Sequence, residues 1–291
     1  MDAGASADER RPQRLKPPKV VAHYGTAEAV PFPTLSEPAC TIFNFALFTI
    51  HDSQRMTDGA KDEQSSRKLT IAIDGPAGAG KSTIASRLAR KLGYINLESG
   101  AMYRALALKA IDRDASFDDE DALLKLAEHS RIQLEPTIGG NRTLLDGRDV
   151  SSRIRERDVS EGASRVSVHP RVREWMVARQ REMGAGGGVV MEGRDIGTQV
   201  FPHADLKIFL DADPVVREQR RMEQQKIKGE VAANVAADLR ERDKRDRTRA
   251  ASPLVAAGDA VLIDSSALSE DEVLTRVEGL VEEKLGNSAV H

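Results

Sequence analysis

Cysteine is almost absent from this sequence, since Cys40 is the single one among 291 residues. One cysteine cannot form an intramolecular disulfide or a zinc site built from several thiolates. The six histidines are scattered and do not have the spacing of metal ligands, so we expect them to be ordinary surface or core residues. Disulfide scaffolds and multi-cysteine zinc sites are therefore excluded.

Long apolar runs and a strong net charge are also lacking. The apolar stretch CTIFNFALFTI, residues 40–50, has about half the length that a membrane-spanning helix needs, and it starts too late for a secretory signal. A formal net charge of -3 gives no global reason to expect a nucleic-acid partner. Hydrophobic residues at 40% and charged residues at 31% are typical of a soluble globular protein. We expect neither a membrane nor a nucleic-acid partner.

Residues 1–67 differ in composition from the rest of the chain. They mix small, charged and proline residues without periodicity, which predicts a disordered N-terminal extension. The apolar segment within it could be a short strand or could rest on the domain surface. Alternatively, Met56 is the true start and the preceding residues come from an upstream start.

From Leu69 onward, apolar runs of strand length alternate with stretches that have helical spacing. The runs are LTIAIDGP, GGVVMEG, LKIFLDA and AVLIDSS, and each leads towards a helical stretch. Strands that alternate with helices form a mostly parallel sheet covered on both faces. The sequence predicts an α/β fold with a doubly wound parallel sheet.

Capping residues mark where three of these helices begin or end. Residues 81–92 have helical periodicity and Gly93 stops it, whereas Asp213 and Pro214 form the start of a later helix. Ser269 and Glu272 form a capping box for the last helix, and Gly286 is predicted to end it.

The loop after the first predicted strand is rich in small residues and opens the first helix. It matches the phosphate-binding pattern G-x-x-x-x-G-K-[ST] with Gly75, Pro76, Ala77, Gly78, Ala79, Gly80, Lys81 and Ser82. Small residues allow backbone N–H groups to surround a phosphate, and the helix N-terminus adds a partial positive charge. Lys81 is expected to reach the β- and γ-phosphates of a nucleotide, and the Ser82 hydroxyl to bind Mg²⁺. A glycine-rich turn without a ligand is the less favoured alternative.

A phosphate loop alone does not separate a kinase from a GTPase or a motor ATPase. The tetrapeptide N-K-x-D, with which GTPases read guanine, does not occur in the sequence. Arginines instead stand beside acidic residues in ESGAMYR, PRVRE, EGRDIGT and ERDKRDRTR. Because arginine binds two phosphate oxygens at once, a second phosphorylated substrate is the natural inference.

At these residues the chain resembles the bacterial cytidylate kinases, which transfer the γ-phosphoryl group of ATP to CMP or dCMP. The motifs are DGPAGAGKST, SGAMYR, HPRVRE, EGRDIGT followed by KIFLDA, RRM and ERDKRDRTRAASPL. The resemblance extends from about Leu69 to Leu285 and excludes the N-terminal extension. It implies ATP and CMP or dCMP as substrates, Mg²⁺ as cofactor, and a cytoplasmic monomer in pyrimidine metabolism.

The resemblance also implies the roles of individual residues. The ATP-binding residues are those of the phosphate loop together with Thr83, and the catalytic residues are Lys81, Arg194 and Arg242. The monophosphate site comprises Ser99, Arg104, Arg194 and Arg242. The cytosine would face Ser164, Arg173 and Asp195, and the sugar would face Asp246 and Arg249. Glu98 departs from the family, because an aspartate usually stands there, and it is left out of the site.

The resemblance further implies a division of the chain. Residues 68–288 would form the kinase domain, with a monophosphate-binding insert at 130–164 and an arginine-bearing lid within 215–250. In the insert, RIQLEPTIGGNRTLLDGRDV predicts strands joined at Gly139 and Gly140.

Other interpretations remain open. By spacing alone, LRERDKRDRTR is a solvated helix face stabilised by charge pairs, and this interpretation is kept for Lys244, Arg245 and Arg247. A kinase for a non-nucleotide acceptor such as shikimate would share the loop and the fold. A non-catalytic nucleic-acid binder could use the arginine-rich stretch, although the net charge and the lack of interleaved aromatic residues count against it.

Overall fold

The computed structural model describes residues 68–137, 140–225 and 230–287. The predicted extension, including the apolar segment at 40–50 and Met56, lies outside these ranges. No helix within them has the length and apolarity needed to cross a membrane.

The described chain alternates between strands and helices, as the sequence predicts. The strands are β1 Thr70–Asp74, β2 Ile95–Glu98, β3 Ile132–Thr137, β4 Gly140–Leu145, β5 Arg148–Asp149, β6 Val189–Gly193, β7 Leu206–Asp211 and β8 Val261–Asp264. The helices are α1 Lys81–Leu92, α2 Ser99–Asp112, α3 Glu120–Glu128, η1 Arg153–Arg155, α4 Arg157–Val166, α5 Pro170–Gly184, η2 Ile196–Val200, α6 Pro214–Gln225, α7 Glu230–Thr248 and α8 Glu270–Asn287.

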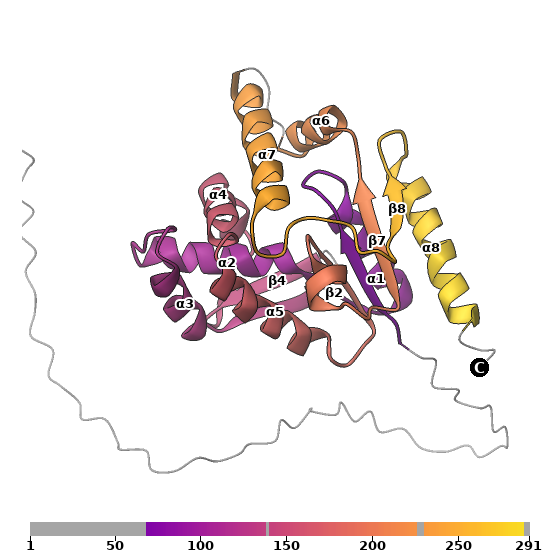
Figure 1. Ribbon diagram of the computed structural model, residues 1–291, viewed down its shortest axis with the longest axis horizontal. Coiled ribbons are helices and arrows are strands. Elements are labelled where there is room, and N and C mark those ends of the chain that lie inside the picture. The colour runs from indigo at the N-terminus through magenta and orange to yellow at the C-terminus, as the bar shows by residue number, and fades with distance from the viewer. Residues whose placement is uncertain (1–67, 138–139, 226–229, 288–291) are drawn as a thin grey trace, which may run out of the picture. The chain divides into compact units, whose positions relative to one another are not determined.

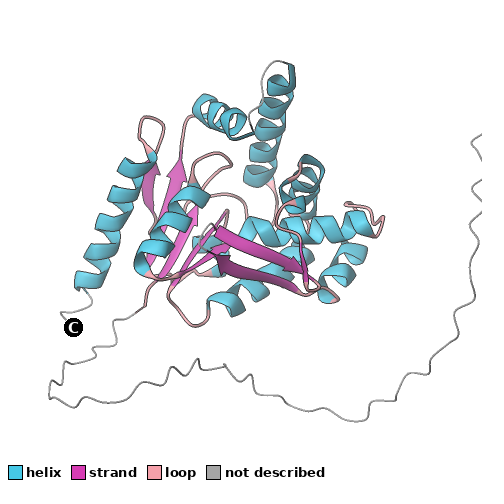
Figure 2. Cartoon of the chain, turned by 180° about the vertical axis from the view of Figure 1, so that it is seen from behind, coloured by secondary structure: helices cyan, strands magenta, loops and turns pink. Residues whose placement is uncertain are grey.

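Five of the strands form a parallel central sheet in the order β2-β6-β1-β7-β8. Figure 1 shows β7 and β8 side by side at one end of this sheet. Helices α1 and α8 cover one face of the sheet (Figure 2). Their apolar side chains pack on β1, β6 and β7. On the other face, η2 and α5 pack on β1, β2 and β6. The predicted doubly wound parallel sheet is therefore confirmed.

The capping residues in the sequence predicted the ends of α1, α6 and α8 to within one residue. Helix α1 spans Lys81–Leu92, and Gly93 follows it with φ 66°. The side chain of Asp213 accepts a hydrogen bond from the Val215 amide at 2.8 Å, one residue after α6 begins. Helix α8 begins at Glu270, directly after Ser269 of the predicted capping box, and ends at Asn287, one residue past Gly286. A difference of one residue is ordinary, because terminal turns lack their full set of hydrogen bonds.

The predicted insert contains a three-stranded antiparallel sheet, β3-β4-β5. The strands are present, although residues 138–139 between them lie outside the described ranges. The second half of the segment is helical, with η1 and α4, and Ser164 therefore stands on a helix. The boundaries of the insert and the lid as separate units stay predictions.

Because the central strands are parallel, their carboxyl ends meet at one edge of the sheet. The phosphate loop follows β1, Ser99 follows β2, and Arg194 and Asp195 follow β6. Residues that are far apart in the sequence are thereby brought to the same edge.

Candidate active site

The loop between β1 and α1 depends on glycine at several positions. Gly78 and Gly80 have φ values of 79° and 94°, which other residues rarely adopt. A Cβ atom on Gly75 would lie 1.9 Å from the carbonyl oxygen of Leu210, so only glycine allows the loop to pass this close to β7. The loop leads directly into α1, whose first backbone N–H groups are available to an anion.

Lys81 lies across this loop. Its Nζ donates a hydrogen bond to the Pro76 carbonyl at 2.7 Å, and the residue is buried. Burial, together with the positive charges of Arg194 and Arg242, lowers the pKa of Lys81 to about 7, against the opposing charge of Glu192. An anion bound here would restore the ordinary pKa of the ammonium group.

Arg242 on α7 belongs to the same cluster of cations. Burial, together with the charges of Arg194 and Arg104, lowers its pKa to about 10, and Asp246 acts against them. Holding several positive charges together in a buried site costs free energy unless an anion balances them. The predicted phosphate-binding residues Lys81, Arg104, Arg194 and Arg242 thus form one electrostatically coupled group. We call these four residues the cationic cluster.

Asp246 orients part of this cluster. Its Oδ2 accepts from Arg194 Nε at 2.9 Å, and its Oδ1 accepts from Arg249 Nη1 at 3.4 Å. Burial acts to raise the pKa of Asp246, but Arg194, Arg242 and Arg249 outweigh it and hold the pKa below its usual value. Asp246 therefore stays ionised and fixes the Arg194 guanidinium; its expected contact with the sugar stays a prediction.

Arg173 and Asp195 form a buried ion pair. Their side chains are only 3% and 7% exposed, and Arg173 Nη2 bonds to Asp195 Oδ2. Arg173 Nη1 also donates to the Ser167 carbonyl at 3.0 Å, and its guanidinium lies 5.5 Å from the centroid of the Tyr103 ring. The pair holds a donor beside an acceptor in a fixed geometry, and the expected contact of both residues with cytosine stays a prediction.

Asp74, which sequence reasoning did not single out, holds the loop that carries Asp195. Its carboxylate accepts from the amides of Ile196 at 2.8 Å and Gly197 at 2.7 Å. Burial raises the pKa of Asp74 to about 6, although these two hydrogen bonds act to lower it. A carboxylate at the end of a buried strand, directly before the phosphate loop, was the signal in the sequence.

Glu192 near the end of β6 was also missed. The Ser82 hydroxyl donates to Glu192 Oε1 at 2.8 Å, and Glu192 is buried. Across the described ranges, no group of three or more His, Cys, Asp or Glu side chains is arranged to hold a metal. Mg²⁺ in kinases is usually held by one or two carboxylates together with substrate phosphates. The Ser82 and Glu192 oxygens fit that donor set.

Glu98 and Ser99 lie at the end of β2. The Glu98 carboxylate forms an ion pair with Arg104. Burial acts to raise the pKa of Glu98, but Arg104 outweighs it and lowers the pKa. Ser99 begins α2, and a Cβ atom on Gly193 would lie 2.5 Å from Ser99 Oγ. Ser99 therefore lies against the residue that precedes Arg194.

Arg217 on α6 connects the phosphate loop to α7. Its Nη1 donates to the Ala77 carbonyl at 3.1 Å and forms an ion pair with Asp243. Sequence reasoning did not identify this residue, because the partner carbonyl belongs to a loop 140 positions earlier.

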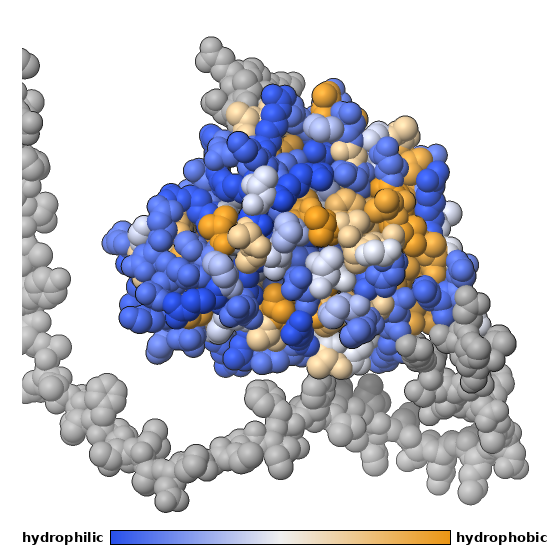
Figure 3. All heavy atoms as spheres, in the orientation of Figure 1, coloured by the Kyte–Doolittle hydropathy of each residue, from blue (hydrophilic) through white to orange (hydrophobic). Residues whose placement is uncertain are grey.

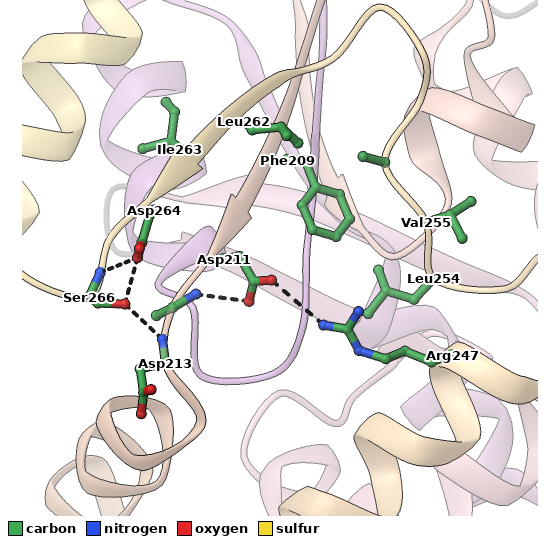
Figure 4. A pocket seen from close by; sticks show the side chains of 12 residues that line it. Phe209, Asp211, Asp213, Arg247, Leu254, Val255, Leu262, Ile263, Asp264 and Ser266 are labelled. Atoms are coloured by element: carbon green, nitrogen blue, oxygen red, sulfur yellow. Dashed lines mark hydrogen bonds and ion pairs between the residues drawn. The ribbon is translucent and has the colours of Figure 1, made fainter.

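Two arginines that the pattern assigned to a solvated helix face have specific partners. Arg245 makes the expected charge pair with Glu241 one turn earlier on α7, and its Nη1 also donates to the buried Ser164 Oγ at 2.8 Å, a contact that the pattern did not predict. Arg247 lies 3.6 Å from Asp211, at a cavity of about 900 Å³ beside the ends of β7 and β8 (Figure 4).

None of the predicted site residues lines this cavity. Its walls include Val255 and Leu262, which are 50% and 69% exposed, and hydrophobic side chains gather over β7 and β8 on the face shown in Figure 3. The cavity therefore lies apart from the cationic cluster.

The lowered pKa of Lys81 predicts proton uptake when a nucleotide binds. With a pKa of about 7, Lys81 is mostly neutral at pH 8 in the empty protein. A polyphosphate would raise the pKa and draw in up to about one proton per nucleotide at pH 8. Titration calorimetry of ATP with Mg²⁺ should give binding enthalpies that vary with the ionisation enthalpy of the buffer. Lys81→Met should remove most of this variation, and an unchanged dependence in that variant would assign the proton to another group.

Comparison with known proteins gives one consistent family. The sequence model described as cytidylate kinase matches residues 71–283. The chain is 46% identical over 222 residues to the cytidylate kinase of Geobacillus kaustophilus (strain HTA426), covering 76% of this chain and 99% of that protein. It is 48% identical over 226 residues to the cytidylate kinase of Solibacter usitatus (strain Ellin6076), covering 76% and 95%. For the cytidylate kinase of Aeromonas salmonicida (strain A449), the identity is 44% over 221 residues, covering 75% and 96%. A phosphate loop and a cationic cluster at one edge of a parallel sheet agree with these similarities, and the chain belongs to the cytidylate kinase family.

Proposed function

We propose that the chain transfers the γ-phosphoryl group of ATP to the phosphate of CMP or dCMP, giving ADP and CDP or dCDP. As a member of the cytidylate kinase family it is an ATP-dependent kinase. The observation that carries the proposal for the site is the cationic cluster. Its lysine belongs to the loop that would hold ATP. Of its arginines, Arg194 follows β6, Arg104 lies on α2 and Arg242 lies on α7.

The transfer needs little covalent chemistry from the protein. A phosphate monoester has a second pKa of about 6, so the attacking oxygen of CMP is mostly deprotonated at neutral pH and needs no general base. That oxygen forms a bond to the γ-phosphorus while the bond from the γ-phosphorus to the β–γ bridging oxygen breaks, and ADP leaves with the electron pair. The protein supplies alignment and positive charge.

The residues divide this work by position. Lys81 would neutralise charge on the β- and γ-phosphates, while Arg194 and Arg242 would contact the transferring group and the acceptor phosphate. Ser99 and Arg104 would complete the acceptor phosphate site, and Asp246 with Arg249 would contact the sugar. Asp246 also positions Arg194 through the hydrogen bond at 2.9 Å.

The proposal includes Mg²⁺ bound with ATP. Ser82 and Glu192 would hold the ion, since the Ser82 hydroxyl and the Glu192 carboxylate meet at the start of α1 beside Lys81. When bound, the ion would neutralise charge on the β- and γ-phosphate oxygens.

The contacts of α7 also bear on the nucleic-acid alternative. Arg245 on α7 bonds to the buried Ser164, and Arg249, which follows α7, is buried and bonds to the Ser252 carbonyl at 2.7 Å. Arginines that hold protein partners are less available to a phosphate backbone, which favours the kinase. The monomeric state and the cytoplasmic location stay predictions.

The proposal is tested by following ADP release from ATP and Mg²⁺ with a panel of acceptors. CMP and dCMP should support rapid release, whereas UMP, AMP and shikimate should support much less. A reaction without acceptor measures ATP hydrolysis and serves as the control. Rapid release with shikimate and none with CMP would contradict the proposal.

A further inference from the structure

Arg245 and Ser164 connect two helices that are distant in the sequence. Arg245 on α7 donates from Nη1 to Ser164 Oγ on α4 at 2.8 Å, across 81 positions. The other terminal nitrogen, Nη2, donates to Glu241 Oε1 at 2.5 Å, one helical turn earlier on α7. Ser164 is buried, and the Arg245 side chain is 29% exposed. The guanidinium is therefore held between a carboxylate on its own helix and the buried hydroxyl.

This contact restricts what the Ser164 hydroxyl can do. A guanidinium has donors and no acceptor, so it occupies a lone pair of Oγ and leaves the hydroxyl hydrogen to be donated elsewhere. A hydroxyl that accepts from a charged donor becomes a better donor and a poorer acceptor. Arg245 occupies one of the two lone pairs and weakens the other as an acceptor, so the hydroxyl favours donating. Without Arg245, the hydroxyl could donate or accept with similar ease.

That difference matters for a base reader. At ring position 3, cytosine has an acceptor where uracil has a donor, so a hydroxyl fixed as a donor distinguishes the two. A rotating hydroxyl could accept from the N3–H of uracil and would lose this distinction. The orientation of one hydroxyl hydrogen thus contributes to base selectivity.

We propose that Arg245 is a positioning residue for base selectivity, which acts by holding the Ser164 hydroxyl as a hydrogen-bond donor. The inference rests on the proposed function, in which Ser164 faces the cytosine. Arg245 stands on the helix that also carries Arg242 and Asp246, so the same helix would serve the base and the phosphate.

The two helices offer a matched control. Arg157 Nη2 on α4 donates to Asp238 Oδ2 on α7 at 2.7 Å, and both side chains are more than half exposed. Arg157→Met removes a contact between the same helices without touching Ser164. Any effect of Arg245→Met that Arg157→Met lacks cannot come from merely loosening α4 against α7.

The experiment measures kcat/KM for CMP and for UMP in the full chain. Arg245→Met should lower the ratio of CMP to UMP efficiency about tenfold, the effect of one hydrogen bond with a charged partner, and leave the KM for ATP within about twofold. The CMP-to-UMP ratio of Arg245→Lys should lie between those of Arg245→Met and the unchanged protein, because an ammonium group can also donate to Ser164 Oγ. Arg157→Met should leave the ratio unchanged. Thermal midpoints of all variants show whether they are folded.

A double-variant comparison completes the test. In a Ser164→Ala background, Arg245→Met should no longer alter the ratio, because the hydroxyl it holds is gone. The inference would be overturned if Arg245→Met lowered the CMP-to-UMP ratio of kcat/KM equally in both backgrounds. It would also be overturned if this ratio in Arg245→Met stayed within twofold of that in the unchanged protein. No loss of ratio in Ser164→Ala would overturn it together with the base-reading role of Ser164. Absence of CMP-dependent ADP release in the unchanged protein would instead overturn the proposed function itself.

Discussion

Lys81→Met should lower kcat for phosphoryl transfer by about 10²- to 10³-fold or more, the loss expected when a charge donor to the transition state is removed. Methionine keeps the apolar stem of the lysine and removes only the ammonium group. That group contacts the phosphate loop itself, through the hydrogen bond to the Pro76 carbonyl at 2.7 Å. Steady-state rates of ADP release with saturating ATP and CMP measure the effect.

The fold should survive this change. Burial and the neighbouring arginines lower the pKa of Lys81 to about 7, so the charged ammonium is not favoured in the empty protein. Removing the ammonium group relieves this unfavourable burial, which offsets the loss of its hydrogen bond to the Pro76 carbonyl, so the thermal midpoint should change little. The matched control is Lys91→Met on the same helix, where the lysine bonds to Glu278 at 2.6 Å and is largely exposed. Activity of Lys81→Met within a fewfold of the control would refute the phosphate-loop assignment.

Asp195→Ala should shrink the preference for CMP over UMP by about 100-fold, since a hydrogen bond to a charged group contributes roughly 1.5–3 kcal/mol. An ionised carboxylate only accepts, which suits the amino group of cytosine and opposes the O4 of uracil. Arg173 only donates, which suits a cytosine acceptor, either N3 or O2. The efficiency for CMP should therefore fall strongly, and that for UMP much less.

The ion pair between Arg173 and Asp195 means that Asp195→Ala should also affect stability. Arg173 is paired with Asp195 in a buried site, so alanine leaves a buried positive charge without its partner and should lower the thermal midpoint. Asp195→Asn keeps the shape and retains an oxygen acceptor for Arg173. It should show the same direction of change in selectivity with a smaller loss of stability. If both variants lowered CMP and UMP efficiency by the same factor, Asp195 would serve the phosphate, the sugar or the loop.

Sequence reasoning was accurate where the determining interactions are local. The phosphate loop, the span of α1 and the capping box of α8 each depend on residues within a few positions of one another. The sheet followed because short apolar runs alternating with helices have few compact arrangements. The family resemblance added roles for Arg194, Arg242 and Asp246, which the structure brings close together.

What the sequence missed depends on contacts between distant segments. Ser82 meets Glu192 across 110 positions, and Asp74 meets the Ile196 amide across 122. No local pattern specifies such pairs, because they form only after β1 and β6 have paired in the sheet.

The arginines of α7 show the same division most clearly. Their spacing predicted a charged helix, and α7 is one, but the same spacing could not say which arginine turns towards which neighbour. Packing against α4, α6 and the ends of the sheet decided this: Arg245 reaches Ser164, Arg240 reaches Glu218 and Arg247 lies near Asp211. Hydrogen bonding, capping and periodicity act over short stretches of chain, so the helices, the strands and the phosphate loop can be predicted from the sequence. The partner of each charged side chain depends on the fold, because a buried charge is stabilised by whichever opposite or polar group the packing brings within reach.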